Sequence, residues 1–551
     1  MRHCIATQTK EKRNSNLRYK LNQIPLDFMT SDIQRSALLT LIENIERCRE
    51  TQDNIDKIYN ELCEIIFSEM NDKIPKFEDN SSKKRYKHRK PYWNDNLMSL
   101  WNKMSIKEKE FTHCKGNRNT RASLRNSYIQ ARDIFDKTLR RTERTYRKMK
   151  AVDIEAMTTK KPNDFWEKIR NLGPRNHKSI PIEIVDESGN IETDEQLVLD
   201  KWRIDFENLY TGSNSDEFDY EHYRTVMSHK YLLETNMEDP LFIQNEYLNR
   251  NITLDEIHDI VMHSKSKSAS GFDEIPYIVL KFPIVIETIL KLFQLILDTS
   301  LIPSIWRKSV ICPILKDPSS DARMPMNYRG VSLLSCISKL YSAFMNKRIT
   351  FYLENEDILA DEQNGFRKDR SCEDHIYTLN SIVRNNKSLF VAFIDLRKCF
   401  DFIDRDMMLY KLLKNNIDGK LYNSIKSIYQ NSESCVRLNG KLTSWFDCVG
   451  IDLADKNLSV LLYADDIALI AKSELDLQCM LDKLHRWCKQ WRVLINTDKS
   501  KCIHFRNGKS KQTEYNFSVG RNSLEIVNQY KYLGVTFSYN GSFFIKCGNT
   551  C

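Results

Sequence analysis

Two adjacent carboxylates, Asp465 and Asp466, stand between two apolar runs, residues 458–462 and 467–471. Short apolar runs on either side of a polar pair are typical of two strands joined at a hairpin bend. The two negative charges repel each other, and burial beside a sheet removes part of their hydration. A divalent cation held by oxygen ligands offsets both costs. The pattern therefore predicts a metal site at this bend, with at least one further ligand.

The candidate third ligand is Asp395, which ends another apolar run, residues 389–394. Two-metal phosphoryl transfer needs carboxylates that bridge two ions about 3.5–4 Å apart. We therefore expect Asp395, Asp465 and Asp466 to converge as catalytic and metal-binding residues around Mg²⁺, with Mn²⁺ as the alternative ion. Acidic residues at strand ends are also common as solvated turn residues, which is the alternative for Asp395 taken alone.

Residues 393–401 and 462–466 resemble the two catalytic motifs of reverse transcriptases, specifically those of non-LTR (LINE-type) retrotransposons. Further segments resemble other motifs of this family in the family's order: residues 270–276, 327–334, 363–371, 496–500 and 530–535. Gly330 stands where the family usually has proline. Because several segments occur in one order, the resemblance is far more specific than a double aspartate alone.

The resemblance implies an α+β fold in which residues 251–385 form the fingers and residues 386–540 the palm of a right-hand polymerase. It implies an RNA-directed DNA polymerase that uses two Mg²⁺ ions, an RNA template, a DNA primer and deoxynucleoside triphosphates. The primer 3′-hydroxyl would attack the α-phosphate, while the ions lower the pKa of the hydroxyl and stabilise the leaving pyrophosphate. Template binding through phosphates should weaken steeply with salt.

Four further residues match family positions that contact the nucleotide: Lys316, Arg329, Phe400 and Lys499. The resemblance implies that the first two cradle the triphosphate, that the aromatic ring excludes a ribose 2′-hydroxyl, and that the last lysine protonates or neutralises pyrophosphate. A surface salt bridge, a core aromatic and a solvated lysine are the respective alternatives. The family's primer grip, expected to contact nucleic acid, matches Tyr532, Leu533 and Gly534.

The chain departs from the family between Asp395 and Asp465. The family carries there a segment whose backbone and glutamine line the nucleotide and template pocket, whereas residues 444–450 lead directly to residues 451–455 here. We expect an internal deletion near residues 449–450. It is either a genuine deletion or an artefact of the splice junctions assigned to the gene. A catalytically inactive remnant that at most binds nucleic acid is therefore the alternative to a working polymerase.

The sequence also predicts truncation outside the matching region. Residues 541–551 follow the primer grip closely and leave no room for a thumb. Residues 1–200 carry no signature of the endonuclease that these elements encode, and we interpret them as a helical basic region. Residues 201–250 are expected to be an acidic, turn-rich connector.

Apolar residues recur at helical spacing in residues 31–67 and 91–170. Basic side chains are concentrated in residues 83–90 and 140–150. Such runs can be solvated faces or nuclear-import signals. Because a polymerase signature adjoins them, we expect them to contact nucleic acid, through Lys83, Lys84, Arg85, Lys87, Arg140 and Arg141.

The chain has 551 residues, 41% of them apolar, and a net charge of +9, which fits two or three globular domains and a polyanionic partner. It has no run of about 18 uncharged apolar residues and no signal-peptide pattern, so we expect an intracellular protein of the nucleus or cytoplasm with no membrane partner. The 15 cysteines are scattered along the chain. Cys547 and Cys551 are close in sequence, but two ligands are too few for a tetrahedral zinc site. The oligomeric state is left open.

Turn and periodicity signals predict individual elements after residue 250. Thr253 and Glu256 have the spacing of a capping box at the start of a helix over residues 252–264. Asp401 is expected to cap a helix, and Asn439 with Gly440 to form a hairpin turn. The other predicted strands are residues 310–315, 389–394 and 436–438, and the other predicted helices are residues 337–354, 404–429 and 473–491.

Overall fold

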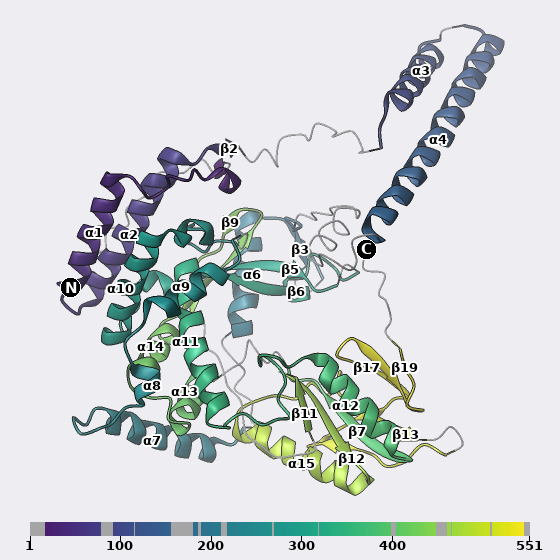
Figure 1. Cartoon of the computed structure of the whole chain (residues 1–551). Coiled ribbons are helices and arrows are strands. Elements are labelled where there is room, and N and C mark those ends of the chain that lie inside the picture. The colour runs from purple at the N-terminus through teal and green to yellow at the C-terminus, as the bar shows by residue number, and fades with distance from the viewer. Residues whose placement is uncertain are drawn as a thin grey trace. The chain divides into compact units, whose positions relative to one another are not determined.

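The computed structural model describes residues 17–78, 92–114, 116–155, 180–185, 189–210, 218–266, 269–317, 319–397, 404–447, 460–463, 465–506 and 510–544. The chain divides into two compact units (Figure 1). The smaller unit is centred on Lys76–Lys178, and the larger unit consists of Tyr19–Pro75 and Ser179–Cys547. Helices and sheets are mixed throughout the larger unit, as the α+β prediction requires.

In the residues that the structure describes, the smaller unit contains a pair of packed helices, α3 (Asp95–Thr112) and α4 (Arg118–Glu155). Leu97 and Met104 of α3 are buried against Phe135 of α4, while Arg140 and Arg141 are exposed. This part of the predicted helical region is confirmed as far as residue 155. The short strands β1 (Leu17–Tyr19) and β2 (Lys76–Glu78) pair with each other.

A helical layer provides the main core of the larger unit. The buried face of α10 (Pro283–Thr299) packs in one cluster with helices α1 (Asp32–Glu46), α2 (Gln52–Lys73), α9 (Leu254–His263), α11 (Cys336–Asn355), α13 (Arg405–Lys414) and α14 (Gly419–Tyr429). Residues 19–75 therefore lie in the larger unit, whereas the sequence interpretation grouped them with residues 1–200. The physical reason is that Leu38 and Leu41 of α1 and Ile66 of α2 are fully buried in this layer.

Most of the predicted helices are confirmed, including the capping box of Thr253 and Glu256 on α9. The single helix predicted over residues 404–429 is wrong, because α13 ends at Lys414 and α14 begins at Gly419. Asn416 takes a left-handed φ of 56°, which the interior of a right-handed helix cannot contain, and Gly419, the first residue of α14, takes a φ of 63°. Buried Ile417 fixes this break in the core. Asp401 lies outside the described residues, and Asp404 caps α13 instead.

A second sheet packs on α6 (Glu195–Tyr210). Its strands run in the order β10 (Phe446–Asp447), β8 (Glu433–Leu438), β5 (Lys308–Leu315) and β6 (Tyr328–Leu333), with β9 (Lys441–Leu442) paired to β8. Trp202 and Phe206 of α6 cover this sheet, and the ring of Trp202 lies 5.0 Å from that of Tyr328. The predicted turn between β8 and β9 is confirmed, since Asn439 and Gly440 both have positive φ.

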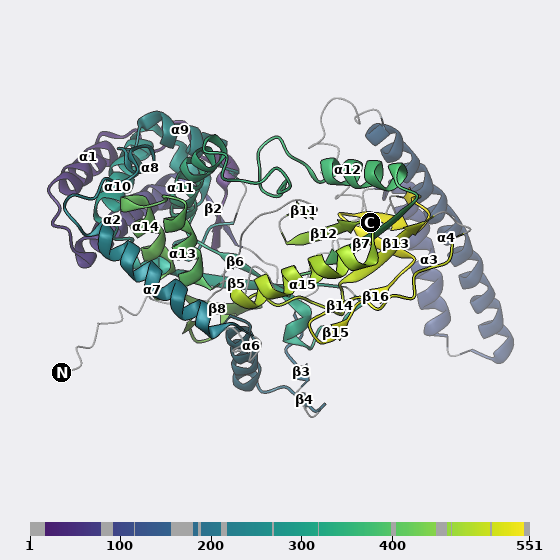
Figure 2. The ribbon, with the colours of Figure 1, turned by 90° about the horizontal axis from the view of Figure 1, so that it is seen from below.

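The third sheet carries the predicted carboxylates. Its strands run in the order β11 (Val460–Tyr463), β12 (Asp466–Ala471), β7 (Ser388–Ile394), β13 (Lys501–Arg506) and β16 (Glu525–Ile526). Phe390, Ala392 and Ile394 of β7 face α15 (Glu474–Gln490). The alternate residues face α12 (Cys372–Asn385) and the hairpin of β17 (Gln529–Tyr532) and β18 (Val535–Ser538) (Figure 2). Because both faces of β7 are covered, its sequence is a continuous apolar run from residue 389 to residue 394.

The remaining elements are short, apart from α7, or join the layers. They are η1 (Leu21–Gln23), β3 (Ile184–Val185), β4 (Ile191–Glu192), α7 (Tyr220–Met237), α8 (Glu246–Asn249), η3 (Tyr277–Lys281), η4 (Ser304–Arg307), η5 (Pro325–Asn327), β14 (Ser518–Val519), β15 (Asn522–Ser523) and β19 (Phe543–Phe544). No helix in the described ranges is long and apolar enough to cross a membrane.

A buried ion pair ties α9 to α11. The Arg348 side chain is 1% exposed, and its guanidinium donates to both carboxylate oxygens of Glu256, at 3.1 and 3.0 Å. Burial alone would raise the pKa of Glu256, but the hydrogen bonds from Arg348 and from the Thr253 backbone lower it to about 2. The bonded, ionised form of Glu256 is therefore the form that stabilises the fold at neutral pH.

We predict that Arg348→Ala destabilises the protein by about 3–5 kcal/mol, because it removes the buried partner that donates to both oxygens of a carboxylate that is only 15% exposed. Arg250 is the matched control, since it contacts the same carboxylate at 3.3 Å but is 46% exposed. Arg250→Ala should cost less than about 1 kcal/mol in urea unfolding.

The same pair predicts how stability changes with pH. Its contribution should be complete above a pH of about 4.5, the unfolded pKa of Glu256, and be lost as the pH falls towards about 2. Glu256→Gln should remove that part of the acid transition. Equal losses for Arg348→Ala and Arg250→Ala would contradict this assignment.

Candidate active site

The predicted hairpin around Asp465 and Asp466 is confirmed. β11 pairs antiparallel with β12, and Tyr463 lies opposite Asp466 in the register. Two residues, 464 and 465, are left to make the turn, of which 464 lies outside the described residues. Asp465 therefore stands in the turn itself and Asp466 begins the second strand.

Strand register brings Asp395 to the same end of the sheet as Asp466. Ile394 of β7 lies opposite Ile467 of β12, so the next residue on β7 and the preceding residue on β12 meet at the sheet edge. Side chains alternate between the faces of a strand. Phe393 and Ala468 both face the α12 side, which places Asp395 and Asp466 on that side as well.

The electrostatics agree with this placement. Burial raises the pKa of Asp466, and the negative charges of Asp465 and Asp395 raise it further. Each of these effects disfavours the ionised form at neutral pH. Asp466 thus interacts with both Asp465 and Asp395 at this end of the sheet.

A turn after α15 fixes the position of Asp395. The Asn496 carboxamide donates to Asp395 Oδ2 at 2.8 Å, and its backbone N–H donates to the Asp395 carbonyl, also at 2.8 Å. The backbone N–H of Asp395 donates to Ser500 Oγ at 3.0 Å, and Lys499 Nζ lies 3.7 Å from Asp395 Oδ2. The predicted lysine segment, residues 496–500, therefore contacts the carboxylate directly.

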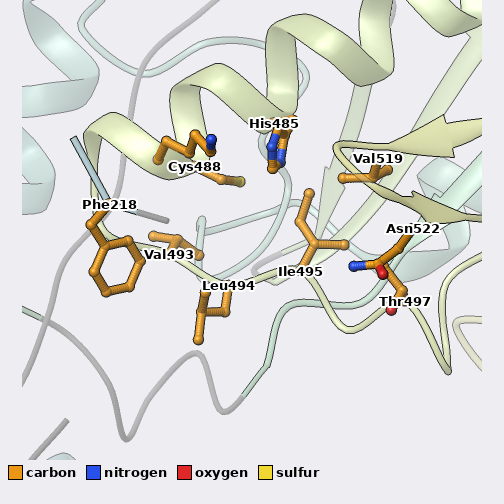
Figure 3. A pocket seen from close by; sticks show the side chains of 10 residues that line it. Phe218, His485, Cys488, Val493, Leu494, Ile495, Thr497, Val519 and Asn522 are labelled. Atoms are coloured by element: carbon orange, nitrogen blue, oxygen red, sulfur yellow. The ribbon is translucent and has the colours of Figure 1, made fainter. Parts of the chain in front are cut away.

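The neighbours of Asn496 point elsewhere. Ile495 and Thr497 line a cavity of about 40 Å³, together with His485, Cys488 and Val519 (Figure 3). This volume suits a water molecule or two rather than a substrate. Of these three consecutive residues, Asn496 is the one whose side chain holds Asp395.

Two tyrosines of β17 lie under the carboxylates. The ring of Tyr530 stacks on Phe393 with centroids 4.6 Å apart, and the ring of Tyr532 lies 5.1 Å from the same phenylalanine. Burial, with the charges of Asp395 and Asp466, raises the pKa of Tyr530 to about 12. Sequence reasoning missed both Tyr530 and Asn496 as neighbours of the carboxylates, because only the pairing of distant strands brings them together.

The structure corrects one predicted nucleic-acid contact. Tyr532 is 2% exposed, and its hydroxyl lies 3.4 Å from the imidazole of His375 in the core. It is buried because inward-facing positions of β17 pack against β7. Leu533 and Gly534 form the tight turn of the β17–β18 hairpin, with φ of 47° and 87°. Their contact with nucleic acid stays a prediction.

The other predicted residues lie on a different sheet from the carboxylates or outside the described residues. Lys316 and Arg329 stand at one end of the β5–β6 pair, where Lys316 Nζ donates to the Met326 carbonyl at 2.7 Å and Arg329 is exposed. Phe400, Lys83, Lys84, Arg85 and Lys87 lie outside the described residues.

Carboxylate oxygens are the ligands that hard divalent cations prefer, so the donor set fits such an ion. A second observation favours a bound cation: the negative charges of Asp465 and Asp395 repel that of Asp466. A cation would reduce this repulsion. Within the described part of the chain, however, no three such side chains lie close enough together to hold a metal ion. A shared ion would therefore have to draw the carboxylates together.

Comparisons with known proteins identify this part of the chain. Residues 314–450 and 445–537 match the family described as reverse transcriptase (RNA-dependent DNA polymerase). The chain contains a reverse transcriptase domain. Members of this family depend on divalent metal ions, which agrees with the composition of the carboxylate cluster.

Several relatives come from retrotransposons. The chain is 24% identical over 375 residues to the probable RNA-directed DNA polymerase from transposon BS of Drosophila melanogaster, which covers 61% of this chain and 41% of that protein. It is 22% identical over 332 residues to the polymerase from mobile element jockey of the same species, covering 53% and 36%. A Pol polyprotein from retrotransposable element R2 of Nasonia vitripennis is 22% identical over 301 residues, covering 47% and 29%. The matches thus span less than half of each relative.

We predict that Asp466→Asn raises the melting temperature in metal-free buffer at neutral pH. The ionised carboxylate is disfavoured by burial and by its charged neighbours, and asparagine removes that cost. Asp482→Asn is the control, because Asp482 is an exposed aspartate on α15. A melting temperature that falls with Asp466→Asn and stays constant with Asp482→Asn would contradict the electrostatic account.

Proposed function

We propose that residues 251–385 and 386–540 form the fingers and palm of an RNA-directed DNA polymerase, in which Asp395, Asp465 and Asp466 bind two Mg²⁺ ions. The register of β7 against β12 is the observation that carries this proposal. It supports a shared site because it brings carboxylates from two distant chain segments to the same end and the same face of one sheet. Template RNA, DNA primer and deoxynucleoside triphosphates would be the partners.

In this proposal the protein contributes mainly position and charge. Divalent ions at the carboxylates would supply a lowered pKa for the primer hydroxyl and charge stabilisation for the leaving pyrophosphate. Lys499, 70% exposed beside Asp395, is positioned to reach the triphosphate. Lys316 and Arg329 would hold phosphate oxygens from the β5–β6 pair, and Phe400 would exclude ribonucleotides.

Asn496 acts in this proposal as a positioning residue. Its carboxamide holds one oxygen of Asp395, and its backbone holds the Asp395 carbonyl. Hydrogen bonds of this kind orient metal-binding carboxylates, and their loss typically weakens metal binding about 10- to 100-fold. The residue is therefore expected to matter for ion affinity without touching substrate.

The connection between β10 and β11 favours the alternative that the chain is catalytically inactive. The two segments that match the family meet at residues 445–450. Only residues 448–459, which lie outside the described residues, join Asp447 to Val460. A connection of this length has no room for the family's pocket segment. We propose that the carboxylates are retained while the nucleotide pocket lacks a wall.

We predict little or no primer extension by the purified chain on an RNA template with Mg²⁺. A misplacement of about 1 Å can cost roughly a hundredfold in rate, and here part of the pocket is absent. A chimera that carries a relative's pocket segment after Val449 should gain activity, and Asp465→Asn should abolish that gain. Robust extension by the unmodified chain, abolished by Asp465→Asn, would refute the inactive alternative.

The smaller unit supports a second role, binding of nucleic acid. Arg140 and Arg141 are exposed on the 38-residue helix α4, within the predicted basic run. Exposed guanidinium groups along a helix suit phosphate contacts, which release counterions. This binding would not require an active polymerase site.

We predict that alanine at Lys83, Lys84, Arg85 and Lys87, or at Arg140 and Arg141, weakens binding of unrelated single-stranded RNAs by a similar factor. The slope of log affinity against log salt should fall by about 0.7 for each phosphate that the variant no longer neutralises. Alanine at Lys103 and Lys109 of α3 is the matched control, because it removes the same charge as the Arg140 and Arg141 pair from the other helix. Unchanged affinity in a filter-binding assay would indicate that these basic runs are solvated faces that do not bind nucleic acid.

A further inference from the structure

Arg492 follows the C-terminal end of α15 at a backbone position that usually carries glycine. Its φ is 59°, in the left-handed region, and the backbone N–H of the next residue, Val493, donates to the Cys488 carbonyl at 2.8 Å. This hydrogen bond is typical of a Schellman motif, in which glycine is common because it has no Cβ. An arginine in this conformation is strained, so the presence of its side chain needs an explanation.

The guanidinium of Arg492 forms a buried ion pair with Asp404, the residue that caps α13. Arg492 Nη1 lies 3.0 Å from Asp404 Oδ2, and the two side chains are 13% and 10% exposed. The other oxygen, Oδ1, accepts hydrogen bonds from the backbone N–H groups of Asp406 and Met407, at 3.1 and 3.2 Å. One oxygen of Asp404 therefore serves the helix cap, and the other holds Arg492.

Aromatic rings at the start of α7 pack on the same guanidinium. The ring centroids of Tyr223 and Phe218 lie 4.8 and 5.4 Å from the guanidinium carbon of Arg492. The backbone N–H of Asp219, the cap of α7, donates to the Lys489 carbonyl of α15 at 3.1 Å, and Figure 2 shows that α7 reaches the end of α15. A cation over aromatic rings is held more strongly when it is desolvated. Contacts from α7 and α13 thus fix the Arg492 side chain.

The chain segments that meet at this ion pair both lead to Asp395. Residues 395–397 and 494–496 form a short antiparallel pair, with two backbone hydrogen bonds of 2.8 Å. Asp404 follows the first of these segments along the chain, and Arg492 precedes the second. The two segments are therefore joined twice, by the backbone pair beside Asp395 and by the ion pair of Arg492.

We propose that Arg492 is a positioning residue for Asp395. Its ion pair with Asp404 holds the start of the turn that carries Asn496, and the Asn496 carboxamide holds Asp395 Oδ2. Arg492 acts through this turn and not by contact with a bound ion. The inference rests on the proposed function, because it assumes that Asp395 binds a divalent ion. The alternative is a purely structural role, in which Arg492 only joins α7 and α13 to α15.

The test measures the Mn²⁺ affinity of the full chain, with the free ion followed by electron paramagnetic resonance. Arg492→Gly removes the guanidinium and suits the left-handed backbone, so it should weaken binding about tenfold while the turn still forms. Asp404→Asn keeps a good capping oxygen for α13 but loses the charge, and it should weaken binding by a similar factor. Arg492→Lys can still pair with Asp404 and should retain most of the wild-type affinity.

A double variant and a matched control separate positioning from general stability. Arg492→Gly combined with Asp404→Asn should bind no more weakly than either single variant, because both changes break the same link. Arg367→Ala is the control, since Arg367 is also a buried arginine, 10% exposed, and pairs with Glu354 at 2.6 Å in the loop between α11 and α12. It should leave the Mn²⁺ affinity unchanged even where it lowers the melting temperature.

Amide hydrogen exchange adds a readout that needs no metal. In Arg492→Gly the backbone N–H groups of Arg397 and Asn496 should exchange faster, while those of the β7–β12 pair keep their protection. Wild-type Mn²⁺ affinity in Arg492→Gly and Asp404→Asn would overturn the inference, and so would an equal loss of affinity in Arg367→Ala or additive losses in the double variant. A wild-type chain that binds no Mn²⁺ would overturn the proposed function itself.

Discussion

The antiparallel pairing of β7 with β12 is the constraint on which the candidate site depends. A shift of one residue in this register would send Asp395 and Asp466 to opposite faces of the sheet, since side chains alternate along a strand. The register is held by apolar residues on both faces, which pack against α15 on one side and against α12 and the β17–β18 hairpin on the other. The position of two repelling carboxylates is therefore fixed by burial elsewhere on the same strands.

The support extends beyond the sheet. The turn at residues 494–500 holds Asp395 through Asn496 and Ser500, and the same turn continues into β13, which pairs with β7. Tyr530 and Tyr532 of β17 pack on Phe393 of β7 and so support the strand that leads to Asp395. Segments separated by more than a hundred residues thus meet at one carboxylate. This arrangement explains why a cluster that is electrostatically unfavourable can persist in a folded domain.

Sequence reasoning predicted the parts of the site that are local. The hairpin at Asp465 and Asp466, the strand that ends at Asp395, and the capped helix α9 all have short-range signals and are confirmed. The family assignment rested on several such segments in order, and the comparisons bear it out. The individual roles of Lys316, Arg329 and Lys499 stay predictions.

The remainder was missed because it depends on contacts between distant segments. Asn496 and Tyr530 appear as ordinary polar and strand residues until β13 and β17 are placed beside β7. Tyr532 was predicted to contact nucleic acid as part of the primer grip, but strand alternation buries it. The membership of α1 and α2 in the larger unit likewise follows from packing on α10, which no local pattern encodes.

The most direct test of the central claim is a titration of the protein with Mn²⁺, in which electron paramagnetic resonance measures the concentration of free ion. The account predicts saturable binding by the wild type that Asp395→Asn and Asp466→Asn each weaken at least about tenfold, since both carboxylates would share the ions. Asn496→Leu should weaken binding by a similar factor through Asp395, whereas Thr497→Ala should not. Equal affinity in the wild type, Asp395→Asn and Asp466→Asn would contradict a shared metal site at this sheet edge.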